Sequence, residues 1–580
     1  MHHKKKIFLY FIIIFYLALG LAYPAEPENG LNFDCYTLPN HMTVLFIQTP
    51  SSVFQTATAL LTVKTGSVTE GKFTGKGVSH FLEHLLFKGT EDKNDTELAR
   101  RVKALGGYVN AHTSFTETQY YIHLPVANID KALAILSEMI LQTNFTLEEF
   151  ENEKNVILRE MDMNDDNPSR FLSIKFFQTH YYKTPLSYPI IGLKKDFSSL
   201  TINDLKEYYA MAYQPSNMIL TVCGHVDAER LKPLIQDLFG KTENRFFVQN
   251  SFSSIQRSIG QRTEVFTKPN LYSTKVMMGF KSCSINDPDL YPLDIAAEVL
   301  AGGASSRLQE KLLNKNLVSS VSSFNYTPEY EGVFVIQFEL PGDNSPESII
   351  GLILDEIESI KRSEINPTEI QRAIQRVSLD YAAGMEKNSD KAFRYTNSFL
   401  LTGTFNFPIT YISALKTVTC DDVAGAAKHY LSRENLTIAV LKPEKNKDES
   451  TQKNEIKETP IPDVDRPELV ALENGIRLIL KGNEKSLATH IMIYLKGGAA
   501  FEKKNQGGLS YLTAQMLMRG TSQLNQQQLA EKIEILGGSC TPISGYNALG
   551  LSYTVLNENL SDAFFVLKDI LTGATFPEAE

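Results

Sequence analysis

The chain has few cysteines, and the part expected to fold contains no cluster of basic residues. Its five cysteines stand singly along 580 residues, and such a scattered, odd-numbered set is neither a disulfide framework nor a cysteine-rich metal site. We expect them to be small core residues. The formal net charge is -10, whereas phosphate binding needs clustered Lys and Arg. These absences argue against a nucleic-acid partner and favour peptides or small molecules.

Repeated membrane spans are also missing, and so is the strong polarity of a disordered chain. Apolar residues make up 43% of the sequence and charged residues 21%, which is the composition of an ordinary soluble globular protein. A chain of this length is several times the size of a typical domain. We therefore expect a water-soluble body of two to four domains.

The first 25 residues differ from the rest. Three lysines at positions 4–6 precede an apolar stretch at 7–22, and small residues at positions 20 and 22 offer a cleavage site. The apolar stretch is short for a membrane span, which needs about 20 residues. The pattern therefore predicts a signal peptide over residues 1–25. No cysteine for lipid attachment lies nearby. We expect an exported, periplasmic or extracellular protein; an uncleaved segment that holds it close to a membrane is the less favoured alternative.

The sequence contains an internal repeat. Residues 77–90 return as residues 508–521, an offset of 431, which is the difference between positions 508 and 77. The same offset places Leu98 on Leu529 with no insertion between. The chain is thus one unit followed by the opening of a second copy. Because the offset matches Glu580 to Glu149, we expect the chain to be a fragment or a truncated protein.

Composition shifts suggest where the domains divide. A polar stretch at 241–261 separates two expected domains of the first unit, at 27–245 and 262–444. Residues 445–466 are dense in charge and almost free of apolar residues, which predicts a solvated linker. The incomplete second copy then occupies residues 467–580.

Apolar and β-branched runs alternate with helical patterns, which predicts an α+β fold built of repeated antiparallel sheets with helices on one face. Strands are predicted at 43–48, 57–64, 118–124 and 218–224. Helices are predicted at 78–87, 95–105, 129–141, 147–163 and 202–212.

One of these helices carries a metal-binding pattern, H-x-x-E-H, at His80, Glu83 and His84. Positions i, i+3 and i+4 share one helix face, so both imidazoles can reach one ion while the glutamate lies beside its water. A catalytic zinc needs a third protein ligand and one open position. Glu153 and Glu160 lie seven residues apart on a later helix, and either could ligate on spacing alone.

Together these motifs resemble the insulinase/pitrilysin (inverzincin) family of zinc metallopeptidases, which includes the mitochondrial processing peptidases and bacterial relatives. The resemblance implies one Zn²⁺ per chain, held by His80, His84 and Glu160, with Glu153 as a supporting carboxylate and Glu83 as the general base. Further stretches that match the family lie at 110–113, 118–120, 189–192, 215–218 and 302–308.

The resemblance also suggests how a substrate would bind. Asn110, Ala111 and Thr113 match the family's edge strand, which takes up substrate as an added β-strand; the plainer interpretation is a polar strand end. His112 and His225 are favoured as local hydrogen-bonding residues rather than ligands.

The expected activity is that of a zinc endopeptidase acting on peptides or unfolded polypeptide segments. An enzyme dedicated to one precursor peptide is compatible with the same residues. The alternative from another class is a non-catalytic assembly or scaffold subunit of the same family. A scaffold would be free to lose the metal-binding residues, and the first unit retains them all.

The sequence departs from the family pattern in two places. The second copy has Tyr511, Ala514 and Gln515 where the first unit has its motif residues, so this copy should be catalytically dead. The resemblance implies that it closes on the first unit to form a chamber. The expected second domain lacks the metal site, and Leu313 and Ser319 stand where the family has an Arg/Tyr pair.

Overall fold

The computed structural model describes most of the chain between residues 31 and 578. The described ranges are 31–50, 55–87, 89–90, 93–244, 260–269, 271–341, 345–444, 468–472, 474–481, 486, 488–503 and 505–578. The expected signal peptide and the expected linker both lie outside these residues.

The first sheet has six strands in the order β1-β2-β8-β3-β7-β6. Their bounds are Asn32–Thr37, Thr43–Gln48, Met218–Gly224, Thr56–Val63, Thr118–Pro125 and Tyr108–Thr113. The four predicted strands are confirmed to within one residue at each end. Every residue of β8 is buried, because this strand lies inside the sheet and is covered on both faces.

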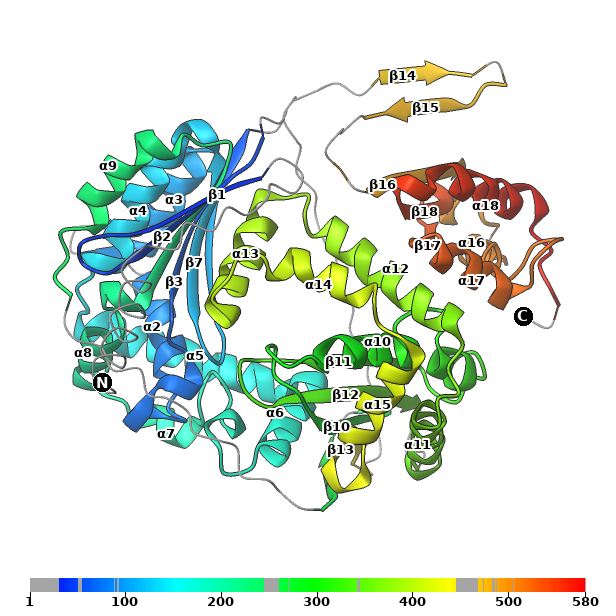
Figure 1. Cartoon of the computed structure of the whole chain (residues 1–580), viewed down its shortest axis with the longest axis horizontal. Helices are drawn as coiled ribbons and strands as arrows, with labels where there is room; N and C mark the ends of the chain where they lie inside the picture. Colours follow the sequence, from blue (N-terminus) through cyan, green and yellow to red (C-terminus); the bar gives the residue numbers. More distant parts are fainter. Residues whose placement is uncertain are drawn as a thin grey trace, which may run out of the picture.

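Helices that cover one face of this sheet enclose the main core (Figure 1). They are α2 (Val78–Leu86), α3 (Asp95–Ala104), α4 (Ile129–Leu141) and α9 (Ala228–Phe239). Nearby lie α5 (Leu147–Asp166) and α8 (Ile202–Ala212). The longest of them, α5, begins with a capping box in which Thr146 and Glu149 satisfy each other's backbone N–H groups.

The second sheet has the order β11-β12-β10-β13-β9, with bounds Ser320–Tyr326, Gly332–Pro341, Ser273–Ser282, Leu436–Pro443 and Arg262–Lys268. Read from β9 to β11, it repeats the strand order of the first sheet without β1, including one parallel pair: β2 with β8 in the first, β9 with β13 in the second. The α+β class is confirmed, but both of these sheets are mixed rather than purely antiparallel. Parallel neighbours arise where a long crossover separates two strands in sequence.

Two helices are exchanged between the sheets. α6 (Pro168–His180) follows α5 in sequence but packs on β10 and β13, while α13 (Asn388–Thr402) packs on β3 and β8. His180 Nδ1 lies 3.1 Å from Thr437 Oγ1, and Thr396 Oγ1 lies 2.7 Å from Thr221 Oγ1. Both faces of the first sheet are therefore covered, and the two halves of the first unit interlock (Figure 1).

The second copy repeats the elements of the first unit at the predicted offset. Its sheet has the order β16-β18-β17, with bounds Ala488–Lys496, Ala548–Leu556 and Gly538–Ser544. Its helices are α16 (Leu509–Met516), α17 (Gln526–Ile535) and α18 (Leu560–Gly573), and β14 (Glu468–Ala471) pairs separately with β15 (Arg477–Leu480). This copy packs on α12 (Pro367–Ala383) of the first unit (Figure 1).

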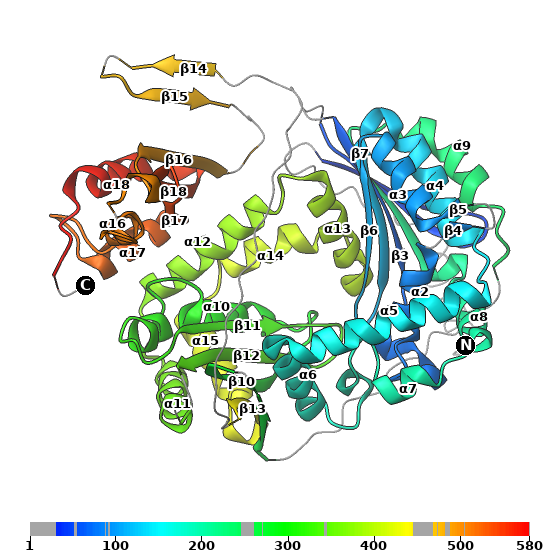
Figure 2. The same cartoon turned by 180° about the vertical axis from the view of Figure 1, so that it is seen from behind.

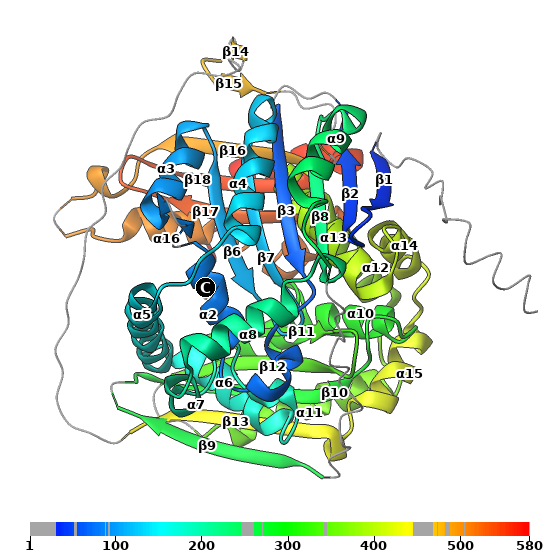
Figure 3. The ribbon, with the colours of Figure 1, turned by 90° about the vertical axis from the view of Figure 1, so that its left-hand side faces the viewer.

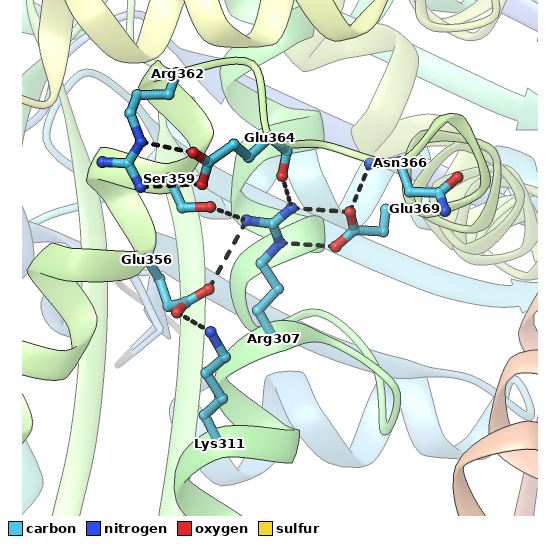
Figure 4. A network of polar contacts seen from close by, with 8 residues as sticks. All are labelled: Arg307, Lys311, Glu356, Ser359, Arg362, Glu364, Asn366 and Glu369. Atoms are coloured by element: carbon cyan, nitrogen blue, oxygen red, sulfur yellow. Dashed lines mark hydrogen bonds and ion pairs between the residues drawn. The ribbon is translucent and has the colours of Figure 1, made fainter.

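α12 is itself fixed by a polar network around Arg307 (Figure 4). The mostly buried Arg307 guanidinium forms two bonds to Glu369, at 2.7 and 2.9 Å, and donates to Ser359 Oγ and the Glu364 carbonyl. Glu369 belongs to the capping box at the start of α12, whereas Ser359 lies on α11 (Glu347–Lys361). The arginine of the 302–308 stretch thus joins two helices of the second sheet layer.

Candidate metal centre

α2 presents two faces of different chemistry. Phe81, Leu82 and Leu86 are fully buried in the main core, so the apolar part of the motif seats the helix. His80 and His84 lie on the other face, one turn apart, with 4.6 Å between their ring centroids. The i, i+4 spacing therefore brings the two imidazoles together as the sequence predicts.

α5 runs beside α2 and supplies the third group (Figures 2 and 3). Glu160 Oε2 lies 3.9 Å from His80 Nε2 and 3.6 Å from His84 Nε2. These distances are too long for hydrogen bonds, which span about 2.7–3.2 Å. Three tetrahedral ligands about 2.0–2.2 Å from a zinc ion would lie about 3.3–3.6 Å apart. The three side chains fit a zinc ion, and all three ligand atoms lie within 4.8 Å of one another.

Glu153 meets a different atom of His84. The Nδ1 of His84 donates to Glu153 Oε1 at 2.8 Å, and Glu153 is only 3% exposed. Burial lowers the pKa of His84, but the hydrogen bond and the charge of Glu153 outweigh it and raise the pKa above its ordinary value. This contact orients the ring so that Nε2 faces Glu160, which is how carboxylates commonly support a metal-binding histidine.

His80 is kept neutral by its surroundings. Burial, together with the charge of His84, lowers its pKa to about 3. A neutral imidazole has a lone pair available for a metal. His80 is therefore a ready ligand across the pH range in which most proteins work.

Glu83 lies on α2 beside this group and is buried. Burial raises the pKa of its carboxyl, and the hydrogen bond that Thr113 Oγ1 donates to Glu83 Oε2, at 2.5 Å, partly opposes the shift. Thr113 is the last residue of β6, so the edge strand ends at this carboxylate. Among the described strands, β6 pairs only with β7 and its outer edge is open.

The other two residues singled out on β6 have different surroundings. Ala111 is partly buried against the main core, whereas Asn110 accepts a hydrogen bond from the backbone N–H of Ala111 through its Oδ1, at 2.9 Å. The exposed His112 packs its ring against Phe393, with 5.6 Å between centroids, and His225 Nδ1 lies 3.2 Å from the Thr49 carbonyl. Neither histidine joins the metal group.

The departures from the family pattern can also be placed. Tyr511 is 61% exposed, and α16 forms no metal-binding group among the residues described. Leu313 ends the short π-helix Gln309–Leu313 and packs against the second core. Ser319 donates its backbone N–H to the Glu339 carbonyl. Neither position therefore supplies the arginine or the tyrosine of the family pattern.

One residue that shapes α2 carries no signal in the sequence patterns. Glu70 is fully buried, and its Oε1 accepts the backbone N–H of Ser79 at 2.9 Å. The contact spans nine residues, outside any helical or strand period, so spacing alone could not indicate it.

Two histidines and a carboxylate on adjacent helices, with a buried glutamate beside them, are the set of groups that a catalytic zinc site requires. Residues 43–193 and 477–580 match the family described as insulinase (peptidase family M16), and residues 199–377 match the peptidase M16 inactive domain. A zinc protease of Rickettsia felis is 30% identical over 417 residues, which cover 71% of this chain and 98% of that protein. The chain therefore belongs to the M16 family and is a zinc protease.

Further similarities agree with this assignment. The zinc protease PqqE of Helicobacter pylori is 29% identical over 422 residues, covering 70% of this chain and 94% of that protein. A crystal structure of a protease from Helicobacter pylori has a TM-score of 0.67 and 27% identity, covering 71% of this chain and all of that one. The periplasmic protease PqqL of Escherichia coli shares the fold over 95% of this chain and 67% of that one, with a TM-score of 0.61 and 18% identity.

Within the described residues, no helix combines the length and the hydropathy that crossing a bilayer requires.

Proposed function

We propose that the chain is a zinc-dependent endopeptidase that hydrolyses peptides or unfolded polypeptide segments. In this proposal one zinc is held by His80, His84 and Glu160, and Glu83 is the general base. The observation that carries it is the convergence of the two Nε2 atoms and Glu160 Oε2 beside the buried Glu83. Zinc, when bound, would supply Lewis-acid activation of water and of the peptide carbonyl.

Three side chains of this protein have separate roles in the rest of the reaction. Thr113 holds Oε2 of Glu83, which leaves Oε1 for the attacking water. Glu83 accepts the proton from that water and passes it to the leaving amine. The burial that raises the pKa of Glu83 brings it closer to neutrality, where a base can both take and return a proton. Glu153 keeps the ring of His84 in place throughout.

The open edge of β6 supports a site for an extended substrate. Asn110, Ala111 and Thr113 lie on this strand, whose outer edge can hydrogen-bond an added β-strand. Because β6 ends at Thr113, a peptide bound along it would pass directly beside Glu83. Backbone pairing of this kind tolerates many sequences, which suits an enzyme acting on unfolded segments. The second copy is proposed to complete a chamber by closing on the first unit.

The test is a peptide-library digest with the purified protein, with and without a chelator. We expect cleavage at internal bonds, its loss on chelation and its return when zinc is added back. Trimming only from the peptide ends, or cleavage that survives chelation, would contradict the endopeptidase proposal. No cleavage at all would favour the scaffold alternative.

We also propose that residues 1–25 direct export to the periplasm or the outside of the cell. The support is the basic, apolar and small-residue pattern of the leader. Mass spectrometry of the mature N-terminus tests it: a protein that keeps residue 1 and stays at the membrane would instead be anchored by this segment.

A further inference from the structure

The start of α2 lacks an ordinary cap. Its N-cap residue is Gly77, in the left-handed region at φ 66°, and no side chain of the cap residue bonds the first turn. The first four N–H groups of any helix have no partner within the helix, and buried ones must find another acceptor. Val78 and Ser79, the first two residues of α2, are both fully buried, so bulk water does not reach their N–H groups.

Glu70 satisfies this end of the helix from nine residues upstream. Its Oε1 accepts the Ser79 N–H at 2.9 Å, and the Ser79 hydroxyl in turn lies 2.6 Å from Tyr208 Oη on α8. Ser79 directly precedes His80. Both the backbone N–H and the hydroxyl of Ser79, the residue before the proposed ligand His80, are thus held by hydrogen bonds.

The second copy shows the same arrangement in a helix without metal-binding residues. Its N-cap is Gly508, again left-handed at φ 92°, and Glu502 accepts from Gly508 N at 2.8 Å and Ser510 N at 2.6 Å. By the 431-residue offset Ser510 matches Ser79, but Glu502 matches Gly71 rather than Glu70. The carboxylate cap is therefore present in both copies at positions one residue out of register.

Its presence in a copy without the metal residues separates two possible roles for this carboxylate. A group that takes part in hydrolysis would have no use in α16, whereas a group that fixes the start of a helix is useful in both copies. Packing alone could also hold α2, because Phe81 contacts Phe150 and Phe197 with centroids 4.9 and 5.2 Å apart. That packing fixes the apolar face of α2, while the Glu70 contact fixes its end.

We propose that Glu70 is a positioning residue for the zinc site: by bonding Ser79 N–H it sets the start of α2 and hence the placement of His80. This inference rests on the proposed function, in which His80 is a ligand. It predicts that loss of the carboxylate loosens the zinc site while leaving its ligands intact. Glu502 provides a matched control, because its helix binds no metal.

The experiment compares Glu70→Ala, Glu70→Gln and Glu502→Ala with the wild type. Zinc affinity is measured by competition with a chelator, and cobalt-substituted protein reports the ligand geometry through its visible absorption. We expect Glu70→Ala to weaken zinc binding about 10-fold, the lower end for groups that orient ligands, and to change the cobalt spectrum. Glu70→Gln keeps an acceptor oxygen and should restore both. Glu502→Ala should leave zinc affinity and the spectrum as in the wild type.

Other outcomes would overturn the inference. Wild-type zinc affinity and an unchanged cobalt spectrum in Glu70→Ala would show that packing alone positions His80. Equal weakening by Glu502→Ala would show a general loss of stability instead. If Glu70→Ala does not fold, Glu70→Asp, which retracts the carboxylate by one methylene, takes its place with the same expected direction. A wild type that binds no zinc would instead refute the proposed function itself.

Discussion

Two glutamates on α5 face the same histidine and meet different atoms of it. Glu153 bonds Nδ1 of His84, whereas Glu160 approaches the Nε2 atoms of both histidines. They lie about two turns apart, so the helix presents both toward α2. The inner carboxylate is nearly inaccessible and orients a ring, while the outer one is placed to coordinate.

We expect the two carboxylates to differ in their effect on zinc affinity. Glu160→Gln removes a ligand and should abolish stoichiometric zinc, whereas Glu153→Gln removes an orienting group and should weaken binding about 10-fold to 100-fold. Glu151→Gln, on the exposed face of the same helix, is the control and should change nothing. Zinc content and chelator competition measure all three. The opposite order for Glu153 and Glu160 would show that the ligand is misassigned.

At this scale the sequence predicts part of the site and misses the rest for physical reasons. The H-x-x-E-H spacing suffices for His80, Glu83 and His84, because helical geometry alone puts them together. Residues seven apart share a face, so spacing left the choice between Glu153 and Glu160 open. Glu70 was missed because its contact depends on how a loop returns to the helix.

The exchanged helix α13 helps to hold the two halves of the first unit together, because it packs on the first sheet. Its Thr396 hydroxyl lies 2.7 Å from that of Thr221 on β8, and both residues are fully buried. A buried hydroxyl that loses its only partner costs about 1–3 kcal/mol, whereas replacing both partners with apolar groups of the same shape is nearly neutral.

This pair gives a test of the interlock. Thr396→Val should lower the free energy of unfolding by about 1–3 kcal/mol, because Thr221 is left buried without its partner. The double variant Thr221→Val/Thr396→Val should recover much of that loss. Denaturant unfolding of the three proteins measures it. Strictly additive losses would show that the two hydroxyls do not interact across the sheet and helix.

Glu70, which bonds the start of α2, should make the free energy of unfolding depend on pH. Burial raises the pKa of Glu70 from its ordinary value of 4.5 to about 8. Between these values the folded protein keeps a proton that the unfolded chain has released, so this contribution to stability falls as pH rises from 4.5 to 8.

Glu70→Gln cannot ionise and should escape this loss. Relative to the wild type, the variant should be more stable at pH 8 by on the order of 1–3 kcal/mol and nearly equal to it below about pH 5. Urea unfolding at both pH values, with chelator present to exclude zinc binding, measures the difference. If Glu70→Gln were instead more stable than the wild type at low pH and not at pH 8, the pKa of Glu70 would not be raised by burial.

The elements themselves were largely predictable, because apolar runs and helical periodicity mark them locally. The predicted helix at 95–105 is observed as Asp95–Ala104, and the predicted strand at 118–124 as Thr118–Pro125. The exchange of α6 and α13 was not, because nothing in an amphipathic pattern says which sheet a helix will cover. The parallel strand pairs were also missed, because a local apolar pattern does not specify which strands become neighbours in a sheet.

The whole molecule joins its two units along α12. Arg372 on this helix pairs with Glu531 on α17 at 3.1 Å, and the buried Glu534 accepts the backbone N–H and the hydroxyl of Ser305. An apolar cluster formed by Leu379, Ala382, Ala488 and Leu556 adds to this contact. The interface therefore combines a small apolar cluster, one ion pair and a buried carboxylate that accepts two hydrogen bonds from Ser305.

Breaking the buried contact should loosen the second unit. Glu534→Ala leaves the donors of Ser305 without an acceptor, at a cost of about 1–3 kcal/mol to the docked arrangement. We expect a larger radius of gyration by small-angle X-ray scattering and faster proteolysis between the units. Lys532→Ala on the exposed face of α17 is the control. Identical scattering profiles for Glu534→Ala and the wild type would show that other contacts fix the two units.

At this scale the internal repeat was the strongest guide. The 431-residue offset matches α16, α17 and α18 to α2, α3 and α4, because copies of one sequence fold alike even after the metal residues are gone. It could not predict that α12 is the docking surface, because α12 lies outside the stretch that is repeated.

The most direct measurement is zinc content together with peptide hydrolysis in the wild type and in Glu83→Gln. We predict about one zinc per chain in both proteins, as a three-ligand site implies. Hydrolysis should fall by about 100-fold to 10,000-fold in the variant, because only the base is removed. Glu83→Gln protein that binds zinc and cleaves at the wild-type rate would contradict the account, and so would a wild type that hydrolyses peptides without any zinc.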